Sequence, residues 1–128
     1  MALGMTCGEA MERNFDVCVA HERLLDALEI MSATQLDCVP VVASRESMLF
    51  EGFISAAAAA LHLGLTDRRP SEVMCREVVA PAAAQVGPEE DANHAAELMK
   101  ARHLQLVPVV AAGKLVGLLP ASRLGRAT

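Results

Sequence analysis

The sequence predicts an α/β (α+β) fold built from two pseudo-symmetric β-α-β-β-α repeats. The first observation is a repeated strand motif: residues 38–42 (CVPVV) are echoed by residues 106–110 (LVPVV), at an offset of 68 (108 − 40). The second is the apolar spacing i, i+4, i+7 before each motif, which is typical of an amphipathic helix and recurs at the same offset. The third is composition. Of the 128 residues 53% are hydrophobic and only 2% aromatic, so the core must be aliphatic.

The same patterns predict the individual elements of each half. The first half should contain a strand at 15–19, a helix at 22–33, strands at 38–42 and 48–54, and a closing helix at 56–63. The second half should contain a strand near 78–79 or 85–86, a helix through Ala92, Ala96 and Met99, strands at 106–110 and 115–119, and a closing helix at 121–126.

Glycine, aspartate, arginine and proline cluster at residues 64–70, which marks a boundary between the halves. We therefore expect a first repeat at 1–64, a linker at 65–70 and a second repeat at 71–128. A unit of roughly 60 residues is only marginally stable alone, so the two halves should share a core. The nearly continuous apolar strands suggest that Val39, Val41, Val107 and Val109 line the interface between the halves.

Charge and hydropathy exclude several classes of function. The formal net charge of −5 argues against a nucleic-acid partner, which would require a concentrated basic surface. The longest apolar stretch, residues 54–65, is too short to span a bilayer, so no membrane partner is expected. The first residues lack the basic region of a secretion signal, which indicates a cytoplasmic location. Nucleotide-loop, nucleophile-elbow and zinc-protease motifs are missing, so the chain is not expected to be an enzyme.

Cysteine and histidine spacing does not predict a metal site. No cysteine pair has CxxC spacing, and the histidines are dispersed. Cys18 and Cys38 lie in apolar runs and are interpreted as structural thiols, whereas Cys7 and Cys75 are expected near the surface. A redox role for that second pair is a third functional hypothesis. The histidines are His21, His62, His94 and His103.

The doubled pattern resembles a tandem pair of CBS domains, named after cystathionine β-synthase, from about Glu9 to Arg126. The features that carry the resemblance are the helix ending in Met, the h-x-P-V-V strand, the hairpin, and the Gly of the last strand, Gly52 or Gly117. The resemblance implies two three-stranded sheets packed together with helices outside. It also implies a regulatory rather than a catalytic role, adenosine-containing ligands in two clefts between the halves, and dimerisation.

The expected ligand motif is altered in both halves. Ligand-binding members of the family carry Thr/Ser-x-x-Asp where the last strand enters the closing helix. The hydroxyl contacts phosphate, and the Asp holds the ribose hydroxyls. The matching positions here are Ser55 and Ala58 in the first half, and Pro120 and Arg123 in the second. Both carboxylates and one hydroxyl are therefore missing.

Charges beside the repeated strands also differ from the family pattern. Phosphate-binding relatives often carry a basic residue there, but Asp37 would repel a phosphate, while Arg123 together with Ser122 could attract one. Two structural alternatives stay open, namely that Ser55 caps a helix and that Arg123 is a solvated surface residue. The candidate ligand-binding residues are Asp37, Cys38, Ser55, Ala58, Gln105, Leu106, Pro120, Ser122 and Arg123.

Two functional hypotheses follow. The first is a regulatory module that senses a small ligand, such as an adenosyl nucleotide, and modulates a partner whose identity the sequence does not give. The second is a structural or dimerisation module with ligand-free clefts. The sequence requires no cofactor, and an adenosine nucleotide is the ligand class that the resemblance suggests. The apolar helices at 22–33 and 56–63 predict a homodimer, with Ala59 on its contact face.

Overall fold

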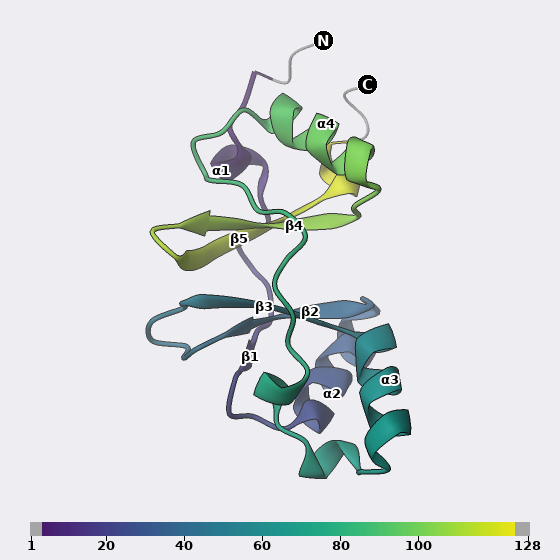
Figure 1. Ribbon diagram of the computed structural model, residues 1–128. Coiled ribbons are helices and arrows are strands. Elements are labelled where there is room, and N and C mark those ends of the chain that lie inside the picture. Colours follow the sequence, from purple (N-terminus) through teal and green to yellow (C-terminus); the bar gives the residue numbers. More distant parts are fainter. Residues whose placement is uncertain (1–3, 125–128) are drawn as a thin grey trace. The chain divides into compact units, whose positions relative to one another are not determined.

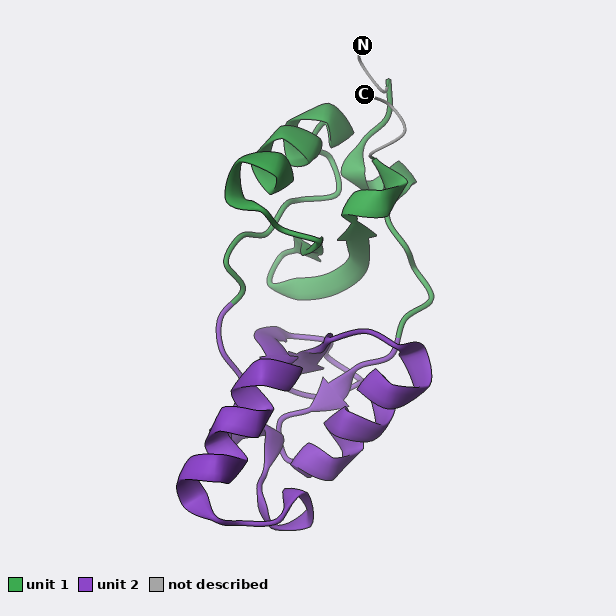
Figure 2. Ribbon diagram, turned by 90° about the vertical axis from the view of Figure 1, so that its right-hand side faces the viewer, with its two compact units in different colours: residues 1–15, 82–128 green, residues 16–81 purple. Residues whose placement is uncertain are grey.

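Helices and strands form in the segments that the repeat pattern marks (Figure 1). The computed structural model describes residues 4–124. The chain divides into two compact units (Figure 2). Unit 1 contains residues 1–15 and 82–128, and unit 2 contains residues 16–81. Each unit therefore combines the hairpin of one sequence repeat with a segment that leads into the other repeat.

Unit 2 carries a three-stranded sheet in the order β1-β2-β3 with two helices. Strand β1 pairs in parallel with β2, and β2 pairs antiparallel with β3. The predicted strand at 15–19 forms only at its last two residues, and the predicted helix at 56–63 continues to Thr66. The elements are β1 (Cys18–Val19), α2 (Leu24–Thr34), β2 (Cys38–Val42), β3 (Phe50–Ser55) and α3 (Ala56–Thr66), followed by the 3₁₀ turns η1 (Pro70–Glu72) and η2 (Cys75–Glu77).

Unit 1 carries a two-stranded antiparallel sheet of β4 and β5. The prediction of a first strand near 78–79 or 85–86 is wrong, because Val86 makes only an isolated parallel bridge to Val109. That bridge matches the pairing of Cys18 with Val41 in unit 2. The chain cannot extend it, since Pro88 has no N–H to donate to a ladder. The elements are α1 (Cys7–Ala10), α4 (Ala92–Arg102), β4 (Leu106–Ala111), β5 (Lys114–Pro120) and the 3₁₀ turn η3 (Ala121–Arg123).

The closing helix predicted at 121–126 is a 3₁₀ turn over its first three residues. Residues 125 and 126 lie outside the described part of the chain. No helix within residues 4–124 has the length and apolar character needed to cross a membrane.

The repeated valines lie in the core of their own unit. Val39 and Val41 belong to a cluster that includes Leu24, Ala27 and Met31 of α2. Val107 and Val109 belong to a second cluster with Ala92, Ala95 and Met99 of α4. All four valines are at most 1% exposed. Each cluster also takes residues from the other sequence half, which confirms that the two halves share their cores. Val73, Cys75 and Val78 join Val39 and Val41, and Cys7, Ala10 and Met11 join Val107 and Val109. Alternate residues of these strands point to the same face, and that face is covered by the unit's own helices.

A glycine in the last strand of each hairpin makes room for the segment that leads into the other repeat. In unit 2, Ala80 exchanges two backbone hydrogen bonds with Phe53, of 2.9 and 3.0 Å. A Cβ on Gly52 would lie 2.0 Å from the Ala80 carbonyl oxygen, and Gly52 has φ +144°. In unit 1, Glu12 pairs with Leu118 in the same way, and a Cβ on Gly117 would lie 2.2 Å from the Met11 sulfur.

We expect Gly52→Ala to lower the free energy of unfolding by about 3 kcal/mol, because the new methyl meets rigid backbone at a strained φ. Gly117→Ala should cost less, since the obstructing group is the flexible Met11 side chain. Gly64→Ala is the matched control. It lies inside α3 with open space around it, and it should stabilise the protein by about 0.5–1 kcal/mol. Urea denaturation measures all three, and an equal cost at Gly52 and Gly117 would contradict this account.

Candidate functional site

The predicted ligand residues gather at two corners, one in each unit. Each corner lies where the first hairpin strand begins and the second ends. In unit 2, Cys38 pairs with Ser55, and the Ala56 N–H donates to the Asp37 carbonyl oxygen at 2.8 Å. We call this the first corner. The second corner, in unit 1, is built in the same way. Leu106 pairs with Pro120, and the Ala121 N–H donates to the Gln105 carbonyl oxygen at 2.8 Å.

At the first corner, Ser55 caps helix α3. Its Oγ accepts a hydrogen bond of 3.0 Å from the Ala58 N–H, and its backbone is extended at φ −98° and ψ 154°. This is the geometry of an N-cap, which satisfies one of the unpaired donors at the start of a helix. The capping interpretation of Ser55 is confirmed. Its neighbour Ala58 offers only a half-buried methyl group packed against the core.

The remaining first-corner side chains leave it without a positive charge. Asp37 is exposed, and Cys38 is half-buried at the start of β2. Burial, and then the charge of Asp37, raise the pKa of the Cys38 thiol, so this thiol stays neutral. An anion entering here would meet the Asp37 carboxylate with no cation to offset it.

At the second corner, Arg123 is engaged within its unit. Its Nη2 donates to Glu12 Oε2 at 2.6 Å, and its Nη1 donates to the Ala10 carbonyl oxygen at 3.3 Å. The two side chains of this ion pair are 43% and 45% exposed. The guanidinium thus ties η3 to the N-terminal segment instead of standing free in solvent. Neither Glu12 nor Ala10 was a sequence candidate, since no local pattern links residues this far apart in the chain.

The other second-corner residues contribute little polar chemistry. Ser122 is exposed on η3, and Pro120 has neither a hydroxyl nor an N–H where the first corner has Ser55. Gln105 is exposed, and Leu106 is half-buried at the start of β4. The two corners therefore share a backbone frame and differ in nearly every functional group.

The cysteines expected near the surface are buried. Cys7 and Cys75 are both 0% exposed. Burial, followed by the charges of Glu90 and Asp91, raises the pKa of the Cys7 thiol to about 11. Both thiols lie against backbone carbonyls, Cys7 near Asp91 and Cys75 near Arg23. Across residues 4–124, no group of three or more His, Cys, Asp or Glu side chains is arranged to hold a metal ion.

Comparison with protein-family models gives one match, to the CBS domain, which occurs twice, at residues 7–59 and 71–127. This chain belongs to the CBS domain family. The two matches follow the two repeats, and several solved structures that resemble this CBS pair are named as CBS proteins. Among curated proteins, no sequence matches it.

Three solved structures illustrate the likeness. The protein is similar to a putative acetoin utilization protein (AcuB) from Vibrio cholerae, with 23% identity, a TM-score of 0.83, and coverage of 98% of this chain and 90% of that one. It is similar to CBSX2 in complex with AMP, with 23% identity, a TM-score of 0.78 and coverage of 97% and 96%. It is also similar to the CBS domain pair of protein MJ0100 in complex with 5′-methylthioadenosine and S-adenosyl-L-methionine, with 15% identity, a TM-score of 0.72 and coverage of 95% and 94%.

We expect Ser55→Ala to lower the free energy of unfolding by about 1 kcal/mol, because the Ala58 N–H loses its capping acceptor. Ser122→Ala is the control and should change stability by less than about 0.5 kcal/mol, since this exposed side chain is not a helix cap. Urea denaturation without ligand measures both. Equal stability of Ser55→Ala and the wild type would show that the cap contributes nothing.

Proposed function

We propose that this chain is a non-catalytic regulatory module that senses a small ligand and modulates a partner protein. The observation that carries the proposal is the doubled CBS domain, with the same backbone corner built in each unit. The complexes of CBSX2 with AMP and of MJ0100 with adenosyl compounds support adenosine-containing molecules as the first ligand class to test. We place the module in the cytoplasm, where its four free cysteines would stay reduced.

The side chains argue for weak binding of AMP, ADP and ATP in the geometry implied by the family resemblance. Ala58 and Arg123 occupy the positions of the two ribose-binding carboxylates. Ser55 already serves as a helix cap, and Arg123 is already paired with Glu12. Each lost charge-assisted hydrogen bond costs about 1.5–3 kcal/mol, or roughly 10- to 150-fold in affinity.

The same engaged groups favour a second candidate function, a structural or dimerisation module whose clefts bind no ligand. A thermal-shift screen with adenosyl compounds separates the two, because a ligand that binds only the folded state must raise the melting temperature. A shift that saturates with any adenosyl compound supports the sensor. No shift across the panel contradicts adenosyl sensing and supports the structural role.

We also propose that the module is a homodimer that associates through helix α3. This helix contains no charged residue, and Leu61 and Leu65 are 63% and 78% exposed. An apolar face of this kind is rarely left in water by a soluble monomer. Ala59 was expected on the contact face, but it is 1% exposed and packs into the core of unit 2. The contact face is therefore the opposite side of the helix, with Ala57, Leu61 and Leu65. The hexameric CBS-CP12 protein is a structural neighbour that self-associates.

We expect AMP to bind the wild type more weakly than about 10 µM, and Ala58→Asp to increase its affinity about tenfold by supplying a carboxylate at the ribose position. Ala60→Asp is the matched control, because it adds the same charge to an exposed position of the same helix that is not among the proposed contact residues. Isothermal titration calorimetry measures all three. A sub-micromolar constant for the wild type, or an equal gain from both variants, would contradict this proposal.

We expect light scattering after size exclusion to give a species of about twice the chain mass of 13.5 kDa. Leu61→Glu should convert it to a monomer, because a buried unpaired charge at the contact costs several kcal/mol. Leu36→Glu is the control, since Leu36 is 51% exposed but lies outside the helices. A wild-type monomer at about tens of micromolar would contradict the dimer proposal. A dimer that persists in Leu61→Glu would show that α3 does not form the contact.

A further inference from the structure

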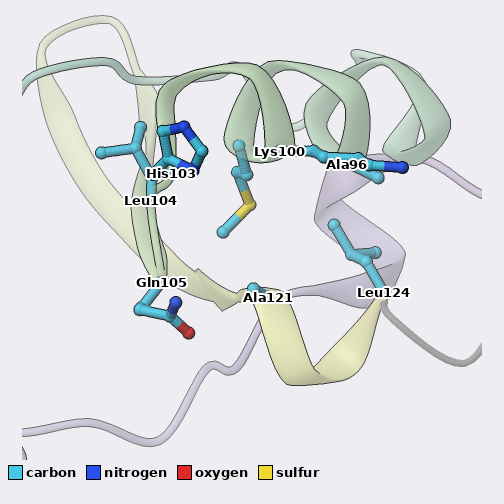
Figure 3. A pocket seen from close by; sticks show the side chains of 8 residues that line it. Ala96, Lys100, His103, Leu104, Gln105, Ala121 and Leu124 are labelled. Atoms are coloured by element: carbon cyan, nitrogen blue, oxygen red, sulfur yellow. The ribbon is translucent and has the colours of Figure 1, made fainter.

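Unit 1 contains a pocket of about 360 Å³ beside helix α4 (Figure 3). Its walls are the C-terminal half of α4, the residues that enter β4, and the turn η3. In Figure 3 the side chain of Leu124 points from η3 towards α4, and the Gln105 amide lies at the opposite edge. The lining residues are Ala96, Met99, Lys100, His103, Leu104, Gln105, Ala121 and Leu124.

The internal repeat shows which side chains distinguish this place from its counterpart in unit 2. At the offset of 68 residues, Ala96 corresponds to Leu28, which packs half-buried against the core of unit 2. The smaller alanine leaves space where the first repeat has a leucine. At the same offset Lys100 and His103 replace Ser32 and Gln35, and Gln105 replaces Asp37, so the second repeat gains basic groups and loses an acidic one.

The pocket is apolar inside and basic at its edge. Met99 and Leu124 are buried, and Leu104 is half-buried. Lys100 and His103 are exposed, and within residues 4–124 Lys100 forms no ion pair. Two of the last four carbonyls of α4 are already bonded, because the His103 N–H donates to the Lys100 carbonyl oxygen and the Leu104 N–H donates to that of Met99. The negative end of the helix is therefore partly satisfied, and Lys100 and Arg102 offset what remains.

We propose that this pocket binds a short aliphatic carboxylate, with the hydrocarbon chain against Ala96, Met99 and Leu124 and the carboxylate paired with the Lys100 ammonium. A pocket of this size is at the small end of the range for ligand sites, which suits a chain of about six to eight carbons. The Gln105 amide supplies a further donor at the edge. The pocket shares Gln105 and Ala121 with the second corner, but the side chains of Ser122 and Arg123 do not line it.

Octanoate is the probe, with octan-1-ol and octylammonium as its neutral and cationic analogues. We expect saturable shifts of the backbone amide NMR signals of the lining residues, with a dissociation constant of about 1 mM for octanoate, as its number of heavy atoms suggests. The alcohol should bind at least about fivefold more weakly, because it lacks the charge-assisted interaction, and the ammonium should bind more weakly still.

The first repeat supplies the test variants. Ala96→Leu restores the residue found at Leu28 and should weaken octanoate binding at least about tenfold by filling the space. Lys100→Ser restores the residue found at Ser32 and should weaken octanoate about fivefold while leaving octan-1-ol unchanged. Ala101→Leu is the control, because it adds the same side chain to α4 at an exposed position outside the pocket. Urea denaturation checks that each variant is folded. If Ala96→Leu does not fold, Lys100→Ser still tests the proposal.

Three outcomes would overturn the proposal. The first is no saturable binding of octanoate by the wild type up to about 20 mM, a concentration well above the expected constant. The second is equal affinity for octanoate and octan-1-ol. The third is unchanged octanoate binding in the folded Lys100→Ser variant. None of these outcomes depends on whether AMP binds, so this proposal can fail while the regulatory role stands.

Discussion

Both units depend on one kind of pairing. The segment that leads into each repeat, near Glu12 or near Ala80, pairs with the last hairpin strand of the other repeat. Residues near Ala80 run beside β3, and residues near Glu12 run beside β5, each over a strand that carries a glycine. The segments also bring core residues with them. Val73, Cys75 and Val78 complete the core of unit 2, and Cys7, Ala10 and Met11 complete that of unit 1. Neither sequence repeat therefore contains all of one hydrophobic core.

This arrangement explains which parts of the fold could be predicted from the sequence. The hairpins and the helices before them were correctly predicted, because local periodicity and the repeated Pro-Val motif determine them. The first strand of each repeat was predicted less well: the one at 15–19 forms only at Cys18–Val19, and the one near 78–79 or 85–86 does not form. Both places are held by a few long-range bonds and not by a pattern of their own. At Val86 the bonds to Pro108 and Val110 are all that the following Gly87 and Pro88 permit. Gly52 was visible in the sequence only as a feature of the family resemblance, since the reason for it is the approach of Ala80 from another part of the chain.

The sequence indicated which residues would be candidates at the corners, but it did not predict which side chains would form ion pairs there. The family resemblance put Ser55, Cys38, Pro120 and Leu106 among the candidates, and the structure pairs Ser55 with Cys38 and Pro120 with Leu106. It could not reveal that Arg123 pairs with Glu12, because a contact between distant surface residues leaves no trace in local sequence. The pocket beside α4 was missed for a related reason. The alignment of Ala96 with Leu28 indicated that space could exist there. However, an alanine on a helix is normally interpreted as an ordinary helix former unless the space around it is known.

The energetic cost of freeing each corner for a ligand is unequal, and this favours the second corner as the site for an anion. At the first corner the Ser55 O–H stays free to donate, because the helix cap uses Oγ only as an acceptor, but an anion held there would lie beside the Asp37 carboxylate. A ligand that recruits Arg123 breaks an exposed ion pair worth about 0–1 kcal/mol, and it replaces the Glu12 carboxylate with an anion that the same planar guanidinium can bind through two hydrogen bonds. Replacing Glu12 by a ligand anion at Arg123 therefore costs almost no free energy, even before the ligand makes any other contact. The loss of the ribose carboxylates affects both corners, so the ligand best suited to the second corner is one whose recognition depends on its charge and not on a sugar diol.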